Sequence, residues 1–224
     1  MAYRSEVMVS HNGGFIPVVV RNYTRADFNA MIALQADCFP PPFPEELWWN
    51  REQLENHVSL FSEGAVCVEY DGRIIGSLTG LLVRFDSEEP DHTWEDMTDG
   101  GFIRNHDPDG DTLYIVDICI SPEFRKAGLG KWMMQAIYQL AVKLDLERVL
   151  GGGRMPGYGK VAGELTAQQY VEKIVQGSLK DPVITFLLRC GRMPVKLIED
   201  YLEDEESHNN ALLMEWKNPF RRGK

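Results

Sequence analysis

The chain has 224 residues, of which 44% are hydrophobic and 25% charged, a composition typical of a folded protein that predicts one elaborated domain over residues 1–224. Its formal net charge of −11 disfavours nucleic acid and anionic membranes as partners, and fits either an amine-bearing ligand or simple solubility. The four cysteines form no CxxC pair and no apolar stretch approaches membrane-spanning length, so we expect no zinc site, no disulfide framework and a cytoplasmic location.

The first half of the chain shows alternating strand and helix signals. A capping box of Thr24 and Asp27 predicts the start of a helix, and the proline run after Phe39 ends it. Asp71-Gly72 lies between two β-rich runs and is a strong hairpin signal. The elements predicted here are a strand at 15–22, a helix from 24 to 39, a helical stretch at 45–61, hairpin strands at 65–70 and 73–83, and an acidic, turn-rich insertion at 84–111.

The second half begins with a nearly continuous apolar run, Thr112–Ile120, which predicts a strand buried on both faces. The further elements predicted are a helix from Leu129, a strand at 148–150, a helix capped by Thr166, a helix capped by Asp181 and ended by Gly191, and strands at 193–198 and 211–216. This order predicts a mixed α/β (α+β) fold, with a central sheet of about six to seven strands flanked by helices and one right-handed crossover.

The segment between the buried strand and the next helix, Arg125-Lys-Ala-Gly128-Leu-Gly130, has the features of a diphosphate site. A helix start exposes unpaired N–H groups and carries partial positive charge, and glycine lets the backbone approach an anion. Trp132 stands where a Walker loop has Ser or Thr, and Met133 where a dinucleotide fingerprint has its third Gly, so neither motif is present. The plain alternative is a glycine-rich turn with surface lysines.

This strand, loop and amphipathic helix resemble the cofactor motif of the GNAT superfamily of acyl-CoA N-acyltransferases, and the element order agrees over a core of about residues 16–217. The resemblance implies that a strand splayed from its neighbour pairs with the pantetheine arm of acetyl-CoA, a role that falls on Ile118, Cys119 and Ile120. It also implies a pyrophosphate-binding loop formed by Arg125, Lys126, Ala127, Gly128, Leu129, Gly130 and Lys131.

A narrower resemblance lies downstream, in GGGRMPGY and DPVITFLLRCG. These stretches are similar to acetyltransferase domains joined to carbon–nitrogen hydrolase (nitrilase-like) domains. The chain departs from the GNAT pattern at Leu187, which stands where the family has the Tyr that commonly protonates the departing CoA thiolate. Another group, or water, must supply that proton if the protein is a catalyst.

Three residues are candidates for direct roles in the reaction. Asp117, a carboxylate inside an apolar strand, is the candidate base, although a buried structural hydrogen bond is an equal alternative. Tyr158 is the candidate acid, with a packed loop aromatic as its alternative. Arg154 binds either a substrate carboxylate or an acidic residue of the chain. Cys119 is interpreted as inert packing rather than as a nucleophile.

We therefore expect a single GNAT-like domain that moves an acetyl group from acetyl-CoA to a primary amine on a small molecule or peptide, without a metal. The aspartates at 107–111 resemble a calcium loop, but Ile118 stands where the closing Glu belongs. One alternative is a non-catalytic acyl-CoA-binding or regulatory module. Another is a protein that supplies an acyltransferase-like half to a separate carbon–nitrogen hydrolase. The sequence leaves a homodimer open and does not identify the amine.

Overall fold

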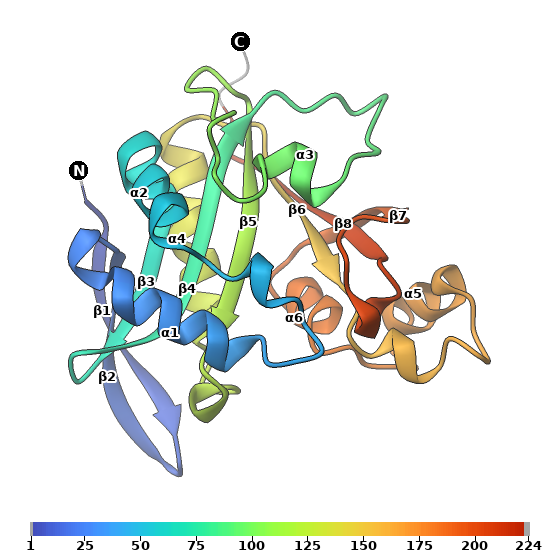
Figure 1. Cartoon of the computed structure of the whole chain (residues 1–224), viewed down its shortest axis with the longest axis horizontal. Coiled ribbons are helices and arrows are strands. Elements are labelled where there is room, and N and C mark those ends of the chain that lie inside the picture. The colour runs from blue at the N-terminus through green and yellow to red at the C-terminus, as the bar shows by residue number, and fades with distance from the viewer. Residues whose placement is uncertain (1, 222–224) are drawn as a thin grey trace.

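A single eight-stranded sheet forms the centre of the molecule (Figure 1). The computed structural model describes residues 2–221. The strands are β1 (Arg4–His11), β2 (Gly14–Asn22), β3 (Ala65–Tyr70), β4 (Arg73–Val83), β5 (Thr112–Ile120), β6 (Arg148–Arg154), β7 (Met193–Ile198) and β8 (Ala211–Lys217). Their order in the sheet is β1-β2-β3-β4-β5-β6-β8-β7, and every neighbouring pair is antiparallel except β5 and β6.

Helices cover both faces of this sheet. They are α1 (Phe28–Cys38), α2 (Arg51–Leu60), α3 (Trp94–Thr98), α4 (Leu129–Lys143), α5 (Ala167–Val175) and α6 (Ile184–Arg189). α1 and α2 lie on one face of the sheet and α4 on the other (Figure 1). α4 is the crossover that makes β5 and β6 parallel, since two parallel neighbours cannot be joined by a tight turn. None of the described helices has the length and apolar character needed to cross a bilayer.

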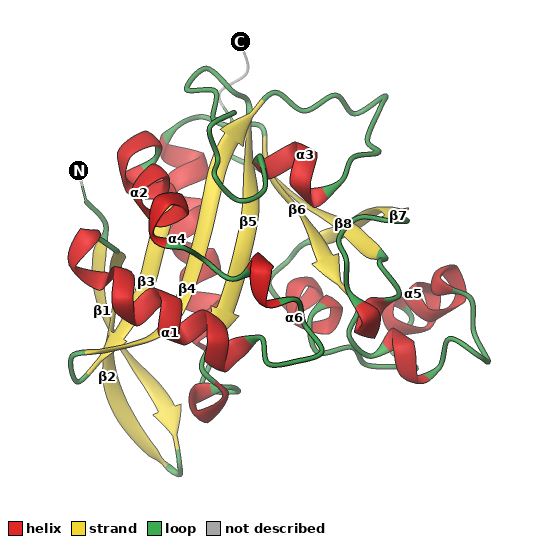
Figure 2. Cartoon of the chain, in the orientation of Figure 1, coloured by secondary structure: helices red, strands yellow, loops and turns green. Residues whose placement is uncertain are grey.

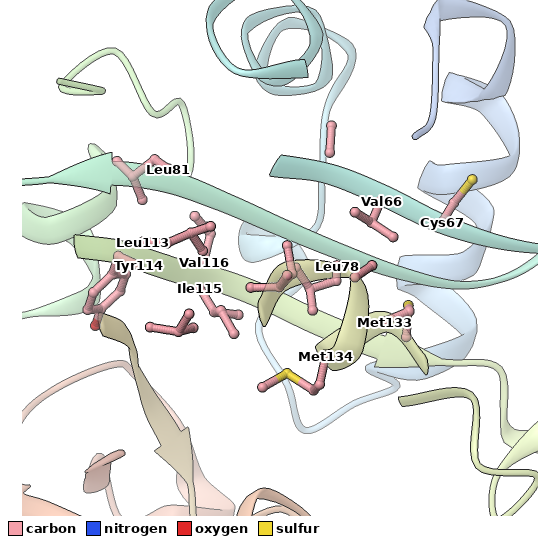
Figure 3. Packing of buried hydrophobic residues seen from close by; sticks show 14 of the residues in the cluster. Val66, Cys67, Leu78, Leu81, Leu113, Tyr114, Ile115, Val116, Met133 and Met134 are labelled. Carbon is pink, nitrogen blue, oxygen red and sulfur yellow. The ribbon is translucent and has the colours of Figure 1, made fainter. Parts of the chain in front are cut away.

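The main core lies between the sheet and its helices. Figure 3 shows Met133 and Met134 of α4 among apolar side chains of β4 and β5, including Leu78. Met133 and Leu78 are both 0% exposed, and residues 112–116 of β5 are buried throughout. The prediction of a strand buried on both faces is therefore confirmed, and this buried strand fixes the position of the loop that follows it.

The mixed α/β fold is confirmed, but the predicted strand count is too low. β1 was not predicted, although the Asn12-Gly13 pair that joins it to β2 is a hairpin signal. Both residues have positive φ, 49° and 78°, as a two-residue turn of this kind requires. The sheet therefore begins at Arg4 and not at residue 15, the start of the first predicted strand. β6 is also longer than predicted, because it continues through the glycines to Arg154.

Two segments differ in detail from the prediction. The helical stretch at 45–61 is a short 3-10 turn, Glu45–Leu47, followed by α2, whose start is fixed by a capping box of Asn50 with Gln53. The acidic insertion at 84–111 contains α3 and contributes buried side chains, since Trp94 is 7% and Ile103 0% exposed. The insertion is therefore part of the core, and Trp94 contacts the central strand β5.

Candidate functional site

The parallel strands β5 and β6 separate part-way along their length, and the ribbons diverge in Figure 2. They pair only from Thr112 to Tyr114 on β5. Just beyond this point Val116 forms a bulge against β4, because Ile115 and Asp117 pair with consecutive β4 residues. A bulge bends its strand and increases its twist, which accounts for the separation. Within the part of the chain that the structure describes, the remaining edge of β5 pairs with no strand.

The free edge of β5 carries the three residues predicted to meet the pantetheine arm. Ile118, Cys119 and Ile120 pair with β4 on one side only. Cys119 is buried, with its Sγ 3.2 Å from the Ser77 hydroxyl. Contact with Cys38 and burial raise the pKa of the Cys119 thiol well above its ordinary value. A protonated, buried thiol is a poor nucleophile, so this geometry favours packing as the role of Cys119.

The predicted phosphate loop follows directly and leads into α4. Gly128 has φ of 82° with open space around its Cα, so its conformation rather than crowding calls for glycine. The N–H groups of Leu129 and Gly130 at the start of α4 have no backbone partner among the described residues and are available to an anion, whereas Lys131 N–H donates to the Gly128 carbonyl at 3.1 Å. The side chains of Arg125, Lys126 and Lys131 are exposed around them. Arg125 also donates a 3.3 Å hydrogen bond to the Cys38 carbonyl at the end of α1.

The second glycine of the loop has a different purpose from the first. A Cβ atom at Gly130 would lie 2.8 Å from the Phe186 ring of α6. Gly130 therefore allows α4 and α6 to pack closely, a requirement that its place in a GxG motif did not reveal. Ala127 is half-buried, and its N–H donates to the Phe124 carbonyl at 3.3 Å. Leu129 is fully buried, so its side chain contributes to packing while its backbone N–H is available to a ligand.

A cavity of about 130 Å³ opens beside the free edge of β5, near its bulge. Most of its wall is apolar, and the side chains come from the α1–α2 connection, α3, β5, β6 and the segments around α6 and β7. Its lining residues are Gln35, Phe39, Phe43, Leu47, Trp49, Trp94, Ile115, Val116, Asp117, Ile118, Gly152, Arg154, Val183, Tyr201 and Leu202. The cavity thus brings Asp117, Ile118 and Arg154 together beside β5.

Asp117 is half-buried in the cavity wall, where a side chain of α1 holds its carboxylate. The Gln35 side-chain amide of α1 donates to its Oδ2 at 2.7 Å. Burial raises the pKa of Asp117 to about 6, against the opposing effects of the Gln35 bond, the Ile118 backbone N–H and the charge of Arg154. A carboxylate with a pKa near 6 is ionised at neutral pH and accepts a proton more readily than an ordinary aspartate. This suits a general base.

Arg154 is already paired with acidic residues of the chain. Its guanidinium donates to both oxygens of Asp204, at 2.8 and 2.6 Å, and to Glu206 at 3.1 Å. It also lies over the rings of Phe39 and Phe43, 5.9 and 4.7 Å from their centroids. Of the two roles predicted for Arg154, the structure favours the internal ion pair. Two carboxylates more than neutralise its charge.

Tyr158 lies outside this cavity. Its hydroxyl donates to the Leu165 carbonyl at 3.3 Å, and its ring packs against Tyr170 and His208. Leu187, at the position of the missing family Tyr, is buried, and its Cδ1 is 2.9 Å from where a Gly153 Cβ would lie. Neither position brings a phenol to the cavity. The role of Tyr158 as an acid stays a prediction that this placement does not support.

A different tyrosine lines the cavity and was not found from the sequence. The hydroxyl of Tyr201 lies 2.7 Å from that of Tyr114, which lies 2.8 Å from His92 Nε2. His92 Nδ1 is 2.7 Å from the Pro90 carbonyl, which only accepts. The neutral His92 ring therefore donates through Nδ1 and accepts through Nε2, so Tyr201 donates to Tyr114 and Tyr114 to His92. Burial lowers the pKa of His92, which favours this neutral form.

Comparison with known proteins places these features in a family. The sequence profile described as "Acetyltransferase (GNAT) family" matches residues 28–154, from α1 to the end of β6. The chain belongs to the acetyltransferase (GNAT) family. It is 54% identical over 214 residues to the uncharacterized N-acetyltransferase YkwB of Bacillus subtilis (strain 168), with 95% of each chain covered. The predicted family resemblance is thereby confirmed.

Another relative carries the hydrolase connection. The chain is 41% identical over 202 residues to the probable hydrolase YhcX of Bacillus subtilis (strain 168), and the match covers 90% of this chain and 39% of YhcX. This is consistent with the predicted likeness to acetyltransferase domains joined to hydrolases.

Solved structures show the same fold. The loading GNATL domain of CurA from Lyngbya majuscula matches with a TM-score of 0.77 and 19% identity, covering 90% of this chain and 98% of that domain. The GNAT-like decarboxylase GphF, in complex with isobutyryl-CoA, matches with a TM-score of 0.72 and 22% identity, covering 89% and 98% of the two chains.

Proposed function

We propose that this chain is an N-acetyltransferase that moves an acetyl group from acetyl-CoA to a primary amine. The observation that carries the proposal is the free edge of β5, which runs from the cavity beside Asp117 to the basic loop before α4. Acetyl-CoA fits this path with its pyrophosphate at the N-terminus of α4, its pantetheine arm along Ile118–Ile120, and its thioester at the cavity. The amine approaches the thioester through the cavity.

The proposed reaction forms a C–N bond and breaks the C–S bond of the thioester. The neutral amine attacks the carbonyl carbon, and a backbone N–H on the free edge of β5 stabilises the oxyanion, a contribution of about 2.7–4 kcal/mol for one such donor. Asp117 accepts the proton that the amine loses, directly or through water. Its raised pKa makes this transfer easier than for an exposed aspartate.

The departing thiolate requires a proton, and Tyr201 is the phenol that lines the cavity. In the proposed step Tyr201 turns its hydroxyl from Tyr114 to the thiolate and protonates it, which gives CoA thiol and a phenolate. The phenolate takes a proton from water as CoA leaves. Tyr114 and His92 hold the Tyr201 hydroxyl in place, because the neutral His92 has no proton on Nε2 to pass on. The segment between β7 and β8 therefore supplies the phenol that Leu187 of α6 does not supply.

Binding and transfer are tested in sequence. Acetyl-CoA binding is measured by calorimetry for the wild type, for the Arg125→Ala/Lys131→Ala variant and for a Lys143→Ala control. Lys143 is exposed at the far end of α4, so the control shows how much affinity is lost when a basic residue outside the loop is removed. Tight binding that only the double variant weakens supports the loop assignment. Catalysis is then tested by incubating the protein with acetyl-CoA and each of a panel of amines, and by measuring the CoA thiol that the transfer releases. No binding in a folded wild-type sample would overturn the proposal.

The alternative is a module that binds acyl-CoA without turning it over, which the apolar position 187 favours. Tight acetyl-CoA binding with no transfer to any amine would support it. A further alternative is an acyltransferase-like partner of a separate carbon–nitrogen hydrolase. The match to part of YhcX motivates that alternative, and co-purification of the chain with such a hydrolase is its test.

A further inference from the structure

The cavity beside Asp117 has an apolar wall built from segments far apart in the sequence. Phe39, Phe43 and Leu47 come from the α1–α2 connection, Trp94 from α3, and Tyr201 and Leu202 from the segment between β7 and β8. Phe39 and Phe43 pack against each other, with ring centroids 4.9 Å apart. Such a wall binds the apolar part of a ligand and offers little to a polar chain.

The charged residues around this cavity leave a net negative charge. Arg154 is the sole basic residue among its described lining residues, and Asp204 and Glu206 already occupy it. Asp204 is 2% exposed, so this pair cannot open without leaving a buried charge unpaired. Asp117 is the remaining charge, and it is negative. A cationic amine is therefore attracted, whereas a substrate carboxylate meets the acid Asp117 and an Arg154 whose charge two carboxylates already neutralise.

The volume limits the size of the ligand. The cavity measures about 130 Å³. An apolar cavity of about 150 Å³ in another protein holds one benzene molecule. A single ring or a short branched chain therefore fills this space, and any larger part of a ligand extends out through the opening of the cavity.

From these observations we propose that the acceptor is a primary amine carried on an apolar body of about one ring and lacking a carboxylate. This inference rests on the proposed acetyl transfer and names its substrate class. The apolar body lies between the side chains of Phe43, Leu47 and Trp94, while the amine points to Asp117 and the thioester. Amino acids fail in this site because their carboxylate finds no unpaired cation.

The test compares amines that differ only in the carboxylate. At saturating acetyl-CoA, we expect kcat/KM for 2-phenylethylamine to exceed that for phenylalanine at least tenfold, and isopentylamine to exceed leucine similarly. Spermidine and lysine are included as polar amines. Equal or better use of phenylalanine, or transfer to spermidine or lysine alone, would overturn the acceptor class and leave the acetyltransferase activity standing. Transfer to no amine would overturn both.

Two variants tie the selectivity to the wall and to the ion pair. Phe43→Ala should lower kcat/KM for 2-phenylethylamine about tenfold without changing acetyl-CoA affinity, whereas Phe15→Ala, at an exposed ring on β2, should change neither. Glu206→Gln leaves Arg154 with one carboxylate. This variant should raise the ratio of kcat/KM for phenylalanine to kcat/KM for 2-phenylethylamine by several-fold. If the ratio is the same in Glu206→Gln and in the wild type, the electrostatic argument is contradicted.

Discussion

The Gln35 side-chain amide donates a 2.7 Å hydrogen bond to the Asp117 carboxylate, and this contact joins α1 to the bulged part of β5. It fixes the carboxylate in the wall of the cavity while leaving its other oxygen free of side-chain donors among the described residues. A hydrogen bond from a neutral amide stabilises the ionised form without removing its basicity. Asp117 is thereby held in the cavity wall, where we propose that it accepts the proton of the amine.

Asp117→Asn should therefore abolish most of the transfer without weakening acetyl-CoA binding. We expect the rate to fall about 10²–10⁴-fold, the usual contribution of a general base. In the wild type, kcat/KM should decline below about pH 6, as Asp117 becomes protonated. Calorimetry provides the control for binding. A variant that retains wild-type kcat would assign Asp117 to structure alone.

The same substitution should stabilise the protein at high pH. Because the folded-state pKa of Asp117 is raised to about 6, the protein favours the protonated form, and stability is lost as pH rises from about 4 to 6. Asn resembles the protonated carboxyl at every pH. Asp117→Asn should thus unfold with a higher free energy at pH 8, by at most about 3 kcal/mol, and match the wild type near pH 3.5. Urea denaturation at both values measures this. A loss of stability at pH 8 contradicts the raised pKa.

Much of this architecture could be predicted from the sequence because local signals agree with the fold. Asp181 accepts hydrogen bonds from the Val183 and Ile184 backbone, as its capping position predicts. The apolar period of α4 buries Met133, and Gly128 adopts the positive φ that a glycine at a helix start permits. These features depend on neighbours within a few residues of one another.

The missed parts depend on contacts between distant segments. Tyr201 follows a strand near the end of the chain, and its partner Tyr114 lies 87 residues earlier. Trp94 sits in an insertion that reads as a polar loop, yet its indole N–H donates to the Val116 carbonyl at 3.0 Å. Arg154 looked available to a substrate because its partner Asp204 is fifty residues away. Hydrophobic periodicity and local spacing do not predict such contacts between side chains that are far apart in the sequence.

Gly130 should be required for stability rather than for binding acetyl-CoA. In Gly130→Ala the new methyl group meets the Phe186 ring, and overpacking of this kind costs about 1–3 kcal/mol. Adding Phe186→Leu should restore most of the loss, since a smaller side chain makes room. Thermal unfolding of the single and double variants measures both steps. If Gly130→Ala instead keeps its stability but loses acetyl-CoA affinity, the glycine serves the anion and not the helix contact.

Tyr201 and Tyr158 can be separated as proton donors by removing one oxygen from each. Tyr201→Phe should lower kcat about tenfold or more while leaving acetyl-CoA affinity unchanged, because the thiolate loses the phenol that lines the cavity. Tyr158→Phe is the matched control, since its hydroxyl contacts only the Leu165 carbonyl among the described residues. Tyr114→Phe should fall between the two, because Tyr201 keeps its hydroxyl but loses the hydrogen-bond partner that orients it. Steady-state kinetics with thiol detection provide kcat. A large loss in Tyr158→Phe with none in Tyr201→Phe would instead make Tyr158 the acid and leave the hydrogen-bonded chain a structural feature.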